Sequence, residues 1–96
     1  NAIPICVTQP HRYVIEKNGQ KFGIPKVLGE GFRGIDYDYS IVQLNKIIFE
    51  LCGENTLDLY SHSFLNSHFY DGAHTTPSGS QEIGEKLAEY IITRFF

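Results

Sequence analysis

The sequence predicts an α/β fold that is built on a parallel sheet. Two short apolar runs alternate with two stretches of helical periodicity along the 96 residues, in the order strand, long loop, helix, strand, loop, helix. This order is one βαβ crossover followed by a closing helix, which is typical of an open parallel sheet. Two parallel strands cannot hide both faces and both edges of a sheet. We therefore expect this chain to form only part of a sheet, the rest of which comes from elsewhere.

The first strand is expected at residues 3–8, where Ile-Pro-Ile-Cys-Val-Thr forms a nearly continuous apolar run that stops at Gln9 and Pro10. Such a run is typical of a strand that is buried on both faces. Residues 11–39 are rich in glycine and aromatic residues and show no clear periodicity, so we expect them to be irregular. A loop of this length inside a compact domain is uncommon and usually functional.

The first helix is expected to begin after Ser40, which is suited to the N-cap, and to end at Gly53 in a left-handed conformation. A second strand is expected at residues 56–60, and a polar loop at residues 61–76. The face of this helix that should pack on the core consists of Ile41, Leu44, Asn45, Ile48, Leu51 and Cys52.

The last helix is expected to begin at Pro77, a residue favoured in the first turn, with Thr76 as its N-cap. Its three–four periodicity predicts one buried face and one face in solvent. The buried face consists of Ile83, Leu87, Ile91 and Phe95. The solvated face consists of Glu82, Glu85, Lys86 and Glu89, and we expect no functional role for its glutamates.

The composition excludes some classes of function. Eight basic residues against eleven acidic ones give a net charge of −3, which argues against a nucleic-acid-binding groove. No apolar stretch is long enough to span a membrane, and the first ten residues lack the pattern of a signal peptide. Because the chain begins with Asn rather than Met, we expect a processed, trimmed or partial chain.

The cysteines and histidines predict neither a disulfide nor a metal site. Cys6 lies in the first strand and Cys52 near the end of the first helix, and two cysteines do not make a disulfide framework. We therefore expect buried free thiols. The spacing of the four histidines matches no zinc signature, so we expect no metal and no other cofactor.

Asp71 and His74 stand in the loop between the second strand and the last helix. Ligand sites of open α/β sheets lie at the carboxyl ends of the strands, where this loop begins. A turn brings side chains three residues apart together, so that the carboxylate accepts the Nδ1–H of the histidine and Nε2 is left as a general base. The spacing also fits a loop in which the histidine only hydrogen-bonds its neighbour.

The stretch Asp-Gly-Ala-His-Thr-Thr-Pro-Ser-Gly at residues 71–79, followed by an amphipathic helix, resembles the last conserved block of the SGNH (GDSL-type) hydrolase family. The resemblance implies a flavodoxin-like three-layer α/β/α sandwich with a parallel sheet, of which residues 1–96 would be the C-terminal portion. It also implies a Ser-His-Asp triad in which His74 is the general base and Asp71 is its orienting carboxylate.

The nucleophile of that family lies in a Gly-Asp-Ser block, and this chain contains no such tripeptide. The oxyanion hole of that family is formed by a Gly and an Asn from two further blocks, and Gly-Glu-Asn at residues 53–55 is similar to a fragment of the Gly-x-Asn block. We do not assign it to the oxyanion hole, because it would lie before a strand, at the opposite edge of the sheet from His74. The resemblance implies that the serine and the oxyanion-hole Gly and Asn lie in a missing N-terminal part or in a second chain. The chain alone should then be inactive. The alternative is a non-catalytic α/β binding or partner subunit with an SGNH-like scaffold.

The substrate that the resemblance implies is an acyl ester, whether a lipid ester, an O-acetylated sugar or a thioester. The loop at residues 11–39 follows the carboxyl end of the first strand, so we expect it to form one wall of the substrate pocket. Gln9, Arg12 and Tyr13 are the residues expected to line that pocket. An equally weighted alternative is that the aromatic residues of this loop only pack onto the sheet.

Overall fold

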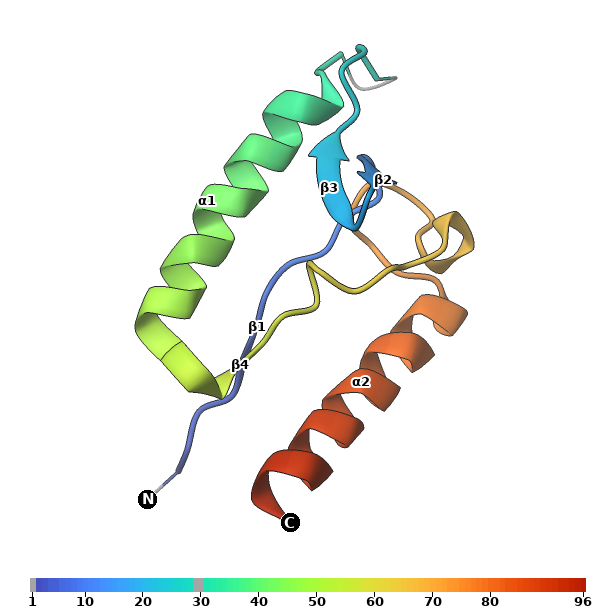
Figure 1. Cartoon of the computed structure of the whole chain (residues 1–96). Coiled ribbons are helices and arrows are strands. Elements are labelled where there is room, and N and C mark those ends of the chain that lie inside the picture. The colour runs from blue at the N-terminus through green and yellow to red at the C-terminus, as the bar shows by residue number, and fades with distance from the viewer. Residues whose placement is uncertain (1, 29–30) are drawn as a thin grey trace.

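The structure is a computed structural model that describes residues 2–28 and 31–96. It contains a pair of parallel strands, an antiparallel hairpin and two long helices (Figure 1), so the expected mixed α/β class with a small parallel sheet is confirmed. In Figure 1 the parallel pair lies between the two helices. The elements are β1 (Cys6–Val7), β2 (Val14–Lys17), β3 (Gln20–Gly23), α1 (Gly34–Cys52), η1 (Gly53–Asn55), β4 (Thr56–Leu57), η2 (Asn66–His68) and α2 (Pro77–Phe95).

The two predicted strands pair in parallel, as a βαβ crossover requires. Cys6 is opposite Thr56 and Val7 is opposite Leu57, and the N–H of Thr8 extends the ladder to the carbonyl of Leu57 at 3.0 Å. Both strands are shorter than expected. The prediction that the first strand is buried on both faces is wrong, because the side chain of Val7 is 41% exposed. No third strand pairs with either of them within the described residues, so part of this apolar surface remains in solvent.

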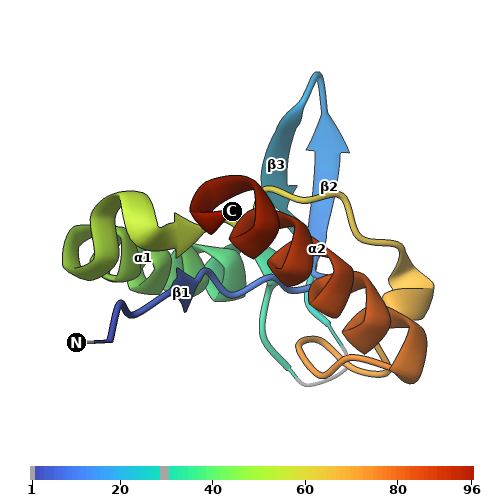
Figure 2. The same cartoon turned by 90° about the horizontal axis from the view of Figure 1, so that it is seen from below.

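Residues 11–39 are not irregular, which corrects the expectation for this segment. β2 and β3 form an antiparallel hairpin in which Lys17 is opposite Gln20. The two residues between them, Asn18 and Gly19, both have positive φ, at 55° and 77°. Asn-Gly is the strongest short-range signal for such a two-residue turn. Figure 2 shows the hairpin projecting beyond both helices. Residues 29 and 30 of this segment lie outside the described residues.

Helix α1 begins at Gly34, so the prediction that Ser40 is its N-cap is wrong. The N-cap is Arg33, whose guanidinium instead binds the carboxylate of Asp36 in the first turn through two hydrogen bonds of 2.8 and 2.9 Å. Gly34 permits close packing, because a Cβ there would lie 2.7 Å from the carbonyl oxygen of Ile24. The other end is at the predicted residue: α1 ends at Gly53, which has a positive φ of +55°, although its ψ of −127° differs from that of the left-handed helical conformation.

The apolar face predicted for α1 is only partly buried. Asn45 is buried and holds the backbone of Gln9, accepting from its N–H at 2.8 Å and donating to its carbonyl at 3.1 Å. Leu51, by contrast, is 80% exposed. Helix α2 begins at Pro77 with Thr76 as N-cap, as predicted, and the Thr76 hydroxyl accepts from the N–H of Gly79. A two-stranded sheet is too narrow to cover both helices, so apolar side chains of each remain exposed.

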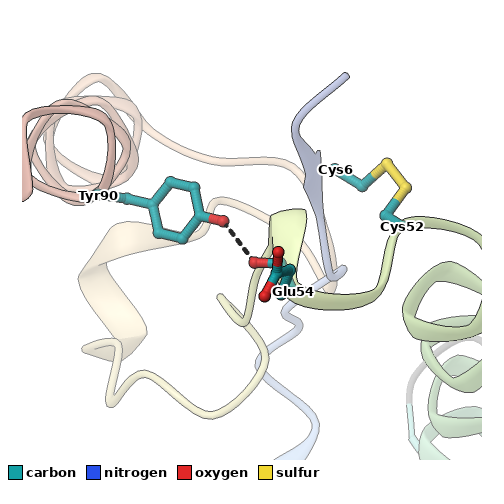
Figure 3. The surroundings of a disulfide bond; sticks show 4 residues. All are labelled: Cys6, Cys52, Glu54 and Tyr90. Atoms are coloured by element: carbon teal, nitrogen blue, oxygen red, sulfur yellow. Dashed lines mark hydrogen bonds between the residues drawn. A yellow bond between two sulfur atoms is a disulfide. The ribbon is translucent and has the colours of Figure 1, made fainter. Parts of the chain in front are cut away.

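Cys6 and Cys52 form a disulfide, so the prediction of free thiols is wrong (Figure 3). Their Cα atoms lie 6.2 Å apart although 46 positions separate them in the sequence. The reason is the crossover: α1 runs antiparallel to the strands, so its C-terminal end returns to the end of the sheet where β1 begins. Near the disulfide, the hydroxyl of Tyr90 on α2 donates to the carbonyl of Glu54 at 3.0 Å (Figure 3).

Among residues 2–28 and 31–96, no helix has the length and apolar character needed to cross a bilayer.

Candidate functional site

The site is built on a closed turn that leads into α2. Phe69 and Thr75 form an isolated antiparallel bridge, and the N–H of Tyr70 donates to the carbonyl of His74 at 3.1 Å. Phe69 is buried and anchors the turn in the core. The turn is therefore held at both ends, and the residues between them project from it.

Asp71 makes three hydrogen bonds inside this turn. Its Oδ1 accepts from the backbone N–H of Ala73 at 2.9 Å and of His74 at 2.7 Å, and its Oδ2 lies 2.8 Å from Nδ1 of His74. The backbone hydrogen bonds from His74 and Ala73, in that order, are the main reason why the pKa of Asp71 is lowered to about 2. Asp71 is therefore ionised at neutral pH and can only accept, so Nδ1 of His74 carries the proton.

His74 presents its other nitrogen to solvent. Its side chain is 71% exposed, and no described residue hydrogen-bonds to Nε2. The ring of Tyr70 stacks against the imidazole, with centroids 5.7 Å apart and an angle of 20° between the planes. An oriented imidazole with an accessible Nε2 is the geometry that a general base needs.

The first turn of α2 holds this arrangement against η2. The hydroxyl of Thr76 donates to the carbonyl of Ser67 at 2.8 Å, and the N–H of Thr76 donates to the carbonyl of His68 at 2.9 Å. A Cβ on Gly79 would lie 2.0 Å from the carbonyl oxygen of His68, so only glycine allows this approach. The position of His74 is thus fixed relative to the helix that follows it.

An open, mostly apolar cavity of about 510 Å³ lies beside His74, between the turn and the start of α1. Its volume is in the range of small-molecule sites. The described residues that line it are Tyr13, Phe32, Asp36, Tyr37, Ser40, Asp71, Gly72, Ala73 and His74.

Of the three predicted pocket residues, the structure brings only Tyr13 to this cavity. The backbone of Gln9 is bound to Asn45, and its side-chain amide donates to the carbonyl of Pro10 at 2.7 Å. Arg12 lines a separate cavity of about 190 Å³. Arg12 and Tyr13 therefore face different cavities, although they are consecutive residues of the bend that precedes β2.

The sequence analysis did not name six of the lining residues as site residues: Phe32, Asp36, Tyr37, Ser40, Gly72 and Ala73. Phe32 and Tyr37 are aromatic residues of the segment predicted to form a wall, and that is the signal that could have identified them. Ser40 carried no such signal. Its hydroxyl donates to the carbonyl of Asp36 at 3.3 Å, in the preceding turn of the helix, and not to His74.

Two further histidines pair with carboxylates away from the cavity. His11 is buried, accepts from the N–H of Tyr13 at Nδ1, and lies 2.9 Å from Asp38 through Nε2. His62 pairs with Glu82, so the prediction that this glutamate is only a solvated residue of α2 is wrong. Since both nitrogens of His11 are engaged within the protein, that histidine has a structural role.

No group of three or more metal-ligating side chains occurs within residues 2–28 and 31–96. No family model, curated protein or solved structure matches this chain.

Proposed function

We propose that this chain supplies the general base and the orienting carboxylate of a serine-dependent ester hydrolase of the SGNH type. The observation that carries the proposal is the Asp71–His74 pair at the rim of the cavity, with Oδ2 and Nδ1 2.8 Å apart. The carboxylate is fixed by two backbone N–H groups, so it orients the imidazole without competing for a proton. The same two roles are those implied by the resemblance of residues 71–79.

In the proposed reaction Nε2 of His74 takes the proton of a serine hydroxyl as its Oγ attacks the ester carbonyl. The imidazolium then gives this proton to the leaving alcohol, and an acyl-serine remains. In the second half of the reaction Nε2 takes a proton from water and the hydroxide attacks the acyl carbon. The imidazolium then returns this proton to the serine as the carboxylic acid product leaves and ionises in solvent. Asp71 stays ionised throughout and stabilises the imidazolium.

The serine and the oxyanion donors belong, in this proposal, to a polypeptide segment N-terminal to residues 1–96 or to a second chain. The proposal also includes the complete fold, a flavodoxin-like sandwich in which α1 and α2 would cover opposite faces of a parallel sheet. The exposed apolar side chains of Val7 on β1 and Leu51 on α1 support this view, because further strands and helices would cover them.

A second candidate is a non-catalytic binding or partner subunit with the same scaffold. The hydroxyl of Ser40 favours it, because the serine that lines the cavity donates to Asp36 and is not activated by His74. The two candidates differ in a single measurable respect, which is whether a serine in the native protein reacts as a nucleophile.

The test is to treat the natively purified protein with a fluorophosphonate probe and to measure intact masses before and after. We expect a label on a serine outside residues 1–96, and no label in the His74→Ala variant. His62→Ala is the matched control, because this histidine also pairs with a carboxylate but lies away from the cavity. Its labelling should be unchanged.

Two results would contradict the proposal. Labelling that persists in folded His74→Ala would remove the histidine from the reaction, and a label on Ser40 would place the nucleophile within this chain. A single unlabelled species of 96 residues would support the binding subunit instead.

A further inference from the structure

Three aromatic rings form one continuous wall of the cavity beside His74. The ring centroids of Tyr13 and Phe32 are 5.5 Å apart, those of Tyr13 and Tyr37 are 5.3 Å apart, and those of Phe32 and Tyr37 are 5.4 Å apart. Each pair is tilted or edge-to-face, which is the favoured geometry of aromatic pairs. The rings come from the hairpin segment and from both sides of the start of α1, so packing holds the wall in place.

These rings form a wall and not a cage. A cage for a quaternary ammonium group needs rings that stand apart, so that the cation lies over several faces at once. Here the three centroids form a triangle with sides of 5.3–5.5 Å, and its centre is occupied by the rings themselves. A ligand can therefore meet only the outer surface of the cluster.

The charges around the wall disfavour an anionic ligand. The described lining residues include two carboxylates, Asp36 and Asp71, and no lysine or arginine. A carboxylate or phosphate group of a ligand would meet these carboxylates, and the guanidinium of Arg33, which lies beside Asp36, is already paired with that carboxylate.

Both carboxylates are also already engaged. Asp36 receives two hydrogen bonds from Arg33, and Asp71 receives three within its turn. Sites that bind polyhydroxylated ligands or ammonium groups need acceptors that are free to replace lost water. This cavity therefore offers mostly apolar contact.

We propose that the cavity binds an uncharged, apolar group of the substrate ester, either aryl or alkyl, against Phe32 and Tyr37. That the bound group belongs to a substrate ester rests on the proposed function. Phe32 and Tyr37 are specificity-determining residues, whereas the buried Tyr13 packs against both of their rings. Among the substrates implied by the resemblance, an ester with an apolar group fits this wall, and a sugar ester or an anionic thioester does not.

The test is an NMR titration of the isotope-labelled chain with four small probes: benzyl alcohol, benzoate, benzylammonium and methyl glucoside. The aromatic resonances of Phe32 and Tyr37 report the site. We expect benzyl alcohol to bind, and benzylammonium to bind no more tightly than benzyl alcohol. Benzoate and the glucoside should bind at least about tenfold more weakly than benzyl alcohol, which corresponds to about 1.4 kcal/mol of binding free energy.

The variants Phe32→Ala and Tyr37→Ala should each weaken binding of benzyl alcohol roughly three- to tenfold, as expected for one aromatic contact. Tyr39→Ala is the matched control. This tyrosine lies two residues from Tyr37 on the same helix, is 67% exposed and does not line the cavity, so its removal should leave binding unchanged. Two separate alanine variants keep the test decisive if one of them fails to fold.

The inference is overturned if benzoate, the glucoside or benzylammonium binds more tightly than benzyl alcohol. It is also overturned if both alanine variants, once shown to be folded, bind like the parent. The His74→Ala variant separates this inference from the proposed function, because it should lose fluorophosphonate labelling and still bind benzyl alcohol. Binding of benzyl alcohol to the chain, together with no labelling of the natively purified parent protein, would refute the hydrolase and retain the apolar site.

Discussion

The ring of Tyr13 lies directly on Gly72, the residue that follows the carboxylate of the candidate site. A Cβ on Gly72 would lie 2.2 Å from Cε2 and 2.5 Å from the hydroxyl oxygen of this tyrosine. The N–H of Arg12 also donates to the carbonyl of Gly72 at 3.0 Å. The segment that leads into the hairpin therefore supports the Asp71–His74 turn by one packing contact and one backbone hydrogen bond.

We expect Gly72→Ala to destabilise the protein by about 1–3 kcal/mol, because the added methyl group must displace the buried ring of Tyr13. Gly84→Ala is the control, since Gly84 lies in α2 and a methyl group there would meet open space. That change should stabilise the helix by roughly 0.5–1 kcal/mol. Denaturant unfolding of the three proteins measures both effects, and equal stability of Gly72→Ala and the parent would refute the contact.

The disulfide should contribute a large part of the stability of so small a chain. Closing a loop between residues 46 positions apart corresponds to about 4 kcal/mol in the chain-entropy description. We expect the variant with both Cys6→Ala and Cys52→Ala to lose a free energy of unfolding of this order. Dithiothreitol should destabilise the parent and leave the double variant unchanged. Alkylation of both thiols in the native, unreduced protein would show that the disulfide does not form.

The lowered pKa of Asp71 predicts a dependence of stability on acid. The pKa falls from 3.8 to about 2 on folding, so the unfolded chain binds more protons than the native one between these values. The stabilisation is therefore fully present above the ordinary pKa and is lost as the pH falls toward 2. Asp71→Asn should be less stable than the parent at neutral pH, and the difference should shrink through this acid window.

Glu50→Gln, at an exposed position of α1, is the control for the charge change. It should follow the parent at every pH. A difference between Asp71→Asn and the parent that does not vary with pH would contradict an ionised, hydrogen-bonded Asp71.

The buried His11, paired with Asp38, predicts a second dependence of stability on pH, nearer to neutral pH. Burial is the main reason why the pKa of His11 is lowered below 6.5. The hydrogen bond to Asp38 acts in the opposite direction and raises this pKa, whereas nearby Lys21 lowers it. Below pH 6.5 the unfolded chain therefore binds a proton that the native chain does not, and stability should fall as the pH decreases from about 7 to 5. Above that window the contribution should be complete.

His11→Gln should flatten this slope even if it lowers stability overall, because the group that titrates is gone. His68→Gln is the matched control: His68 is partly exposed and accepts the N–H of Leu65 at Nδ1. Its slope should resemble that of the parent. A parent protein whose stability is constant between about pH 5 and 7 would show that His11 is not held neutral.

Much of what the sequence predicted correctly depends on neighbours in the chain. Thr76 and Pro77 begin α2, and Gly53 ends α1, because capping involves atoms within one turn of each residue. The pairing of Asp71 with His74 belongs to the same class, since it closes within four residues. The order of elements also predicted the parallel pairing of β1 with β4, because a helix between two strands leaves few other topologies.

Other local signals were present and were misread. Asn18-Gly19 specifies the hairpin turn by its positive φ angles, but the aromatic and glycine content of the surrounding segment concealed the two strands. The same segment hid the start of α1, because Arg33 makes no side-chain cap and Gly34 is a poor helix former. The hairpin turn was within reach of sequence reasoning, whereas the start of α1 carried no such local signal.

By itself, then, the sequence determined the mixed α/β class, the helix ends at Gly53 and Pro77, and the Asp71–His74 pair, because each depends on residues close together or on the order of elements. Only the tertiary structure decided which distant residues meet. The disulfide between Cys6 and Cys52, the contact of Tyr13 with Gly72 and the aromatic wall at the cavity are of this kind. They arise where the crossover and the hairpin fold back on the chain, and no pattern local to the sequence encodes that approach.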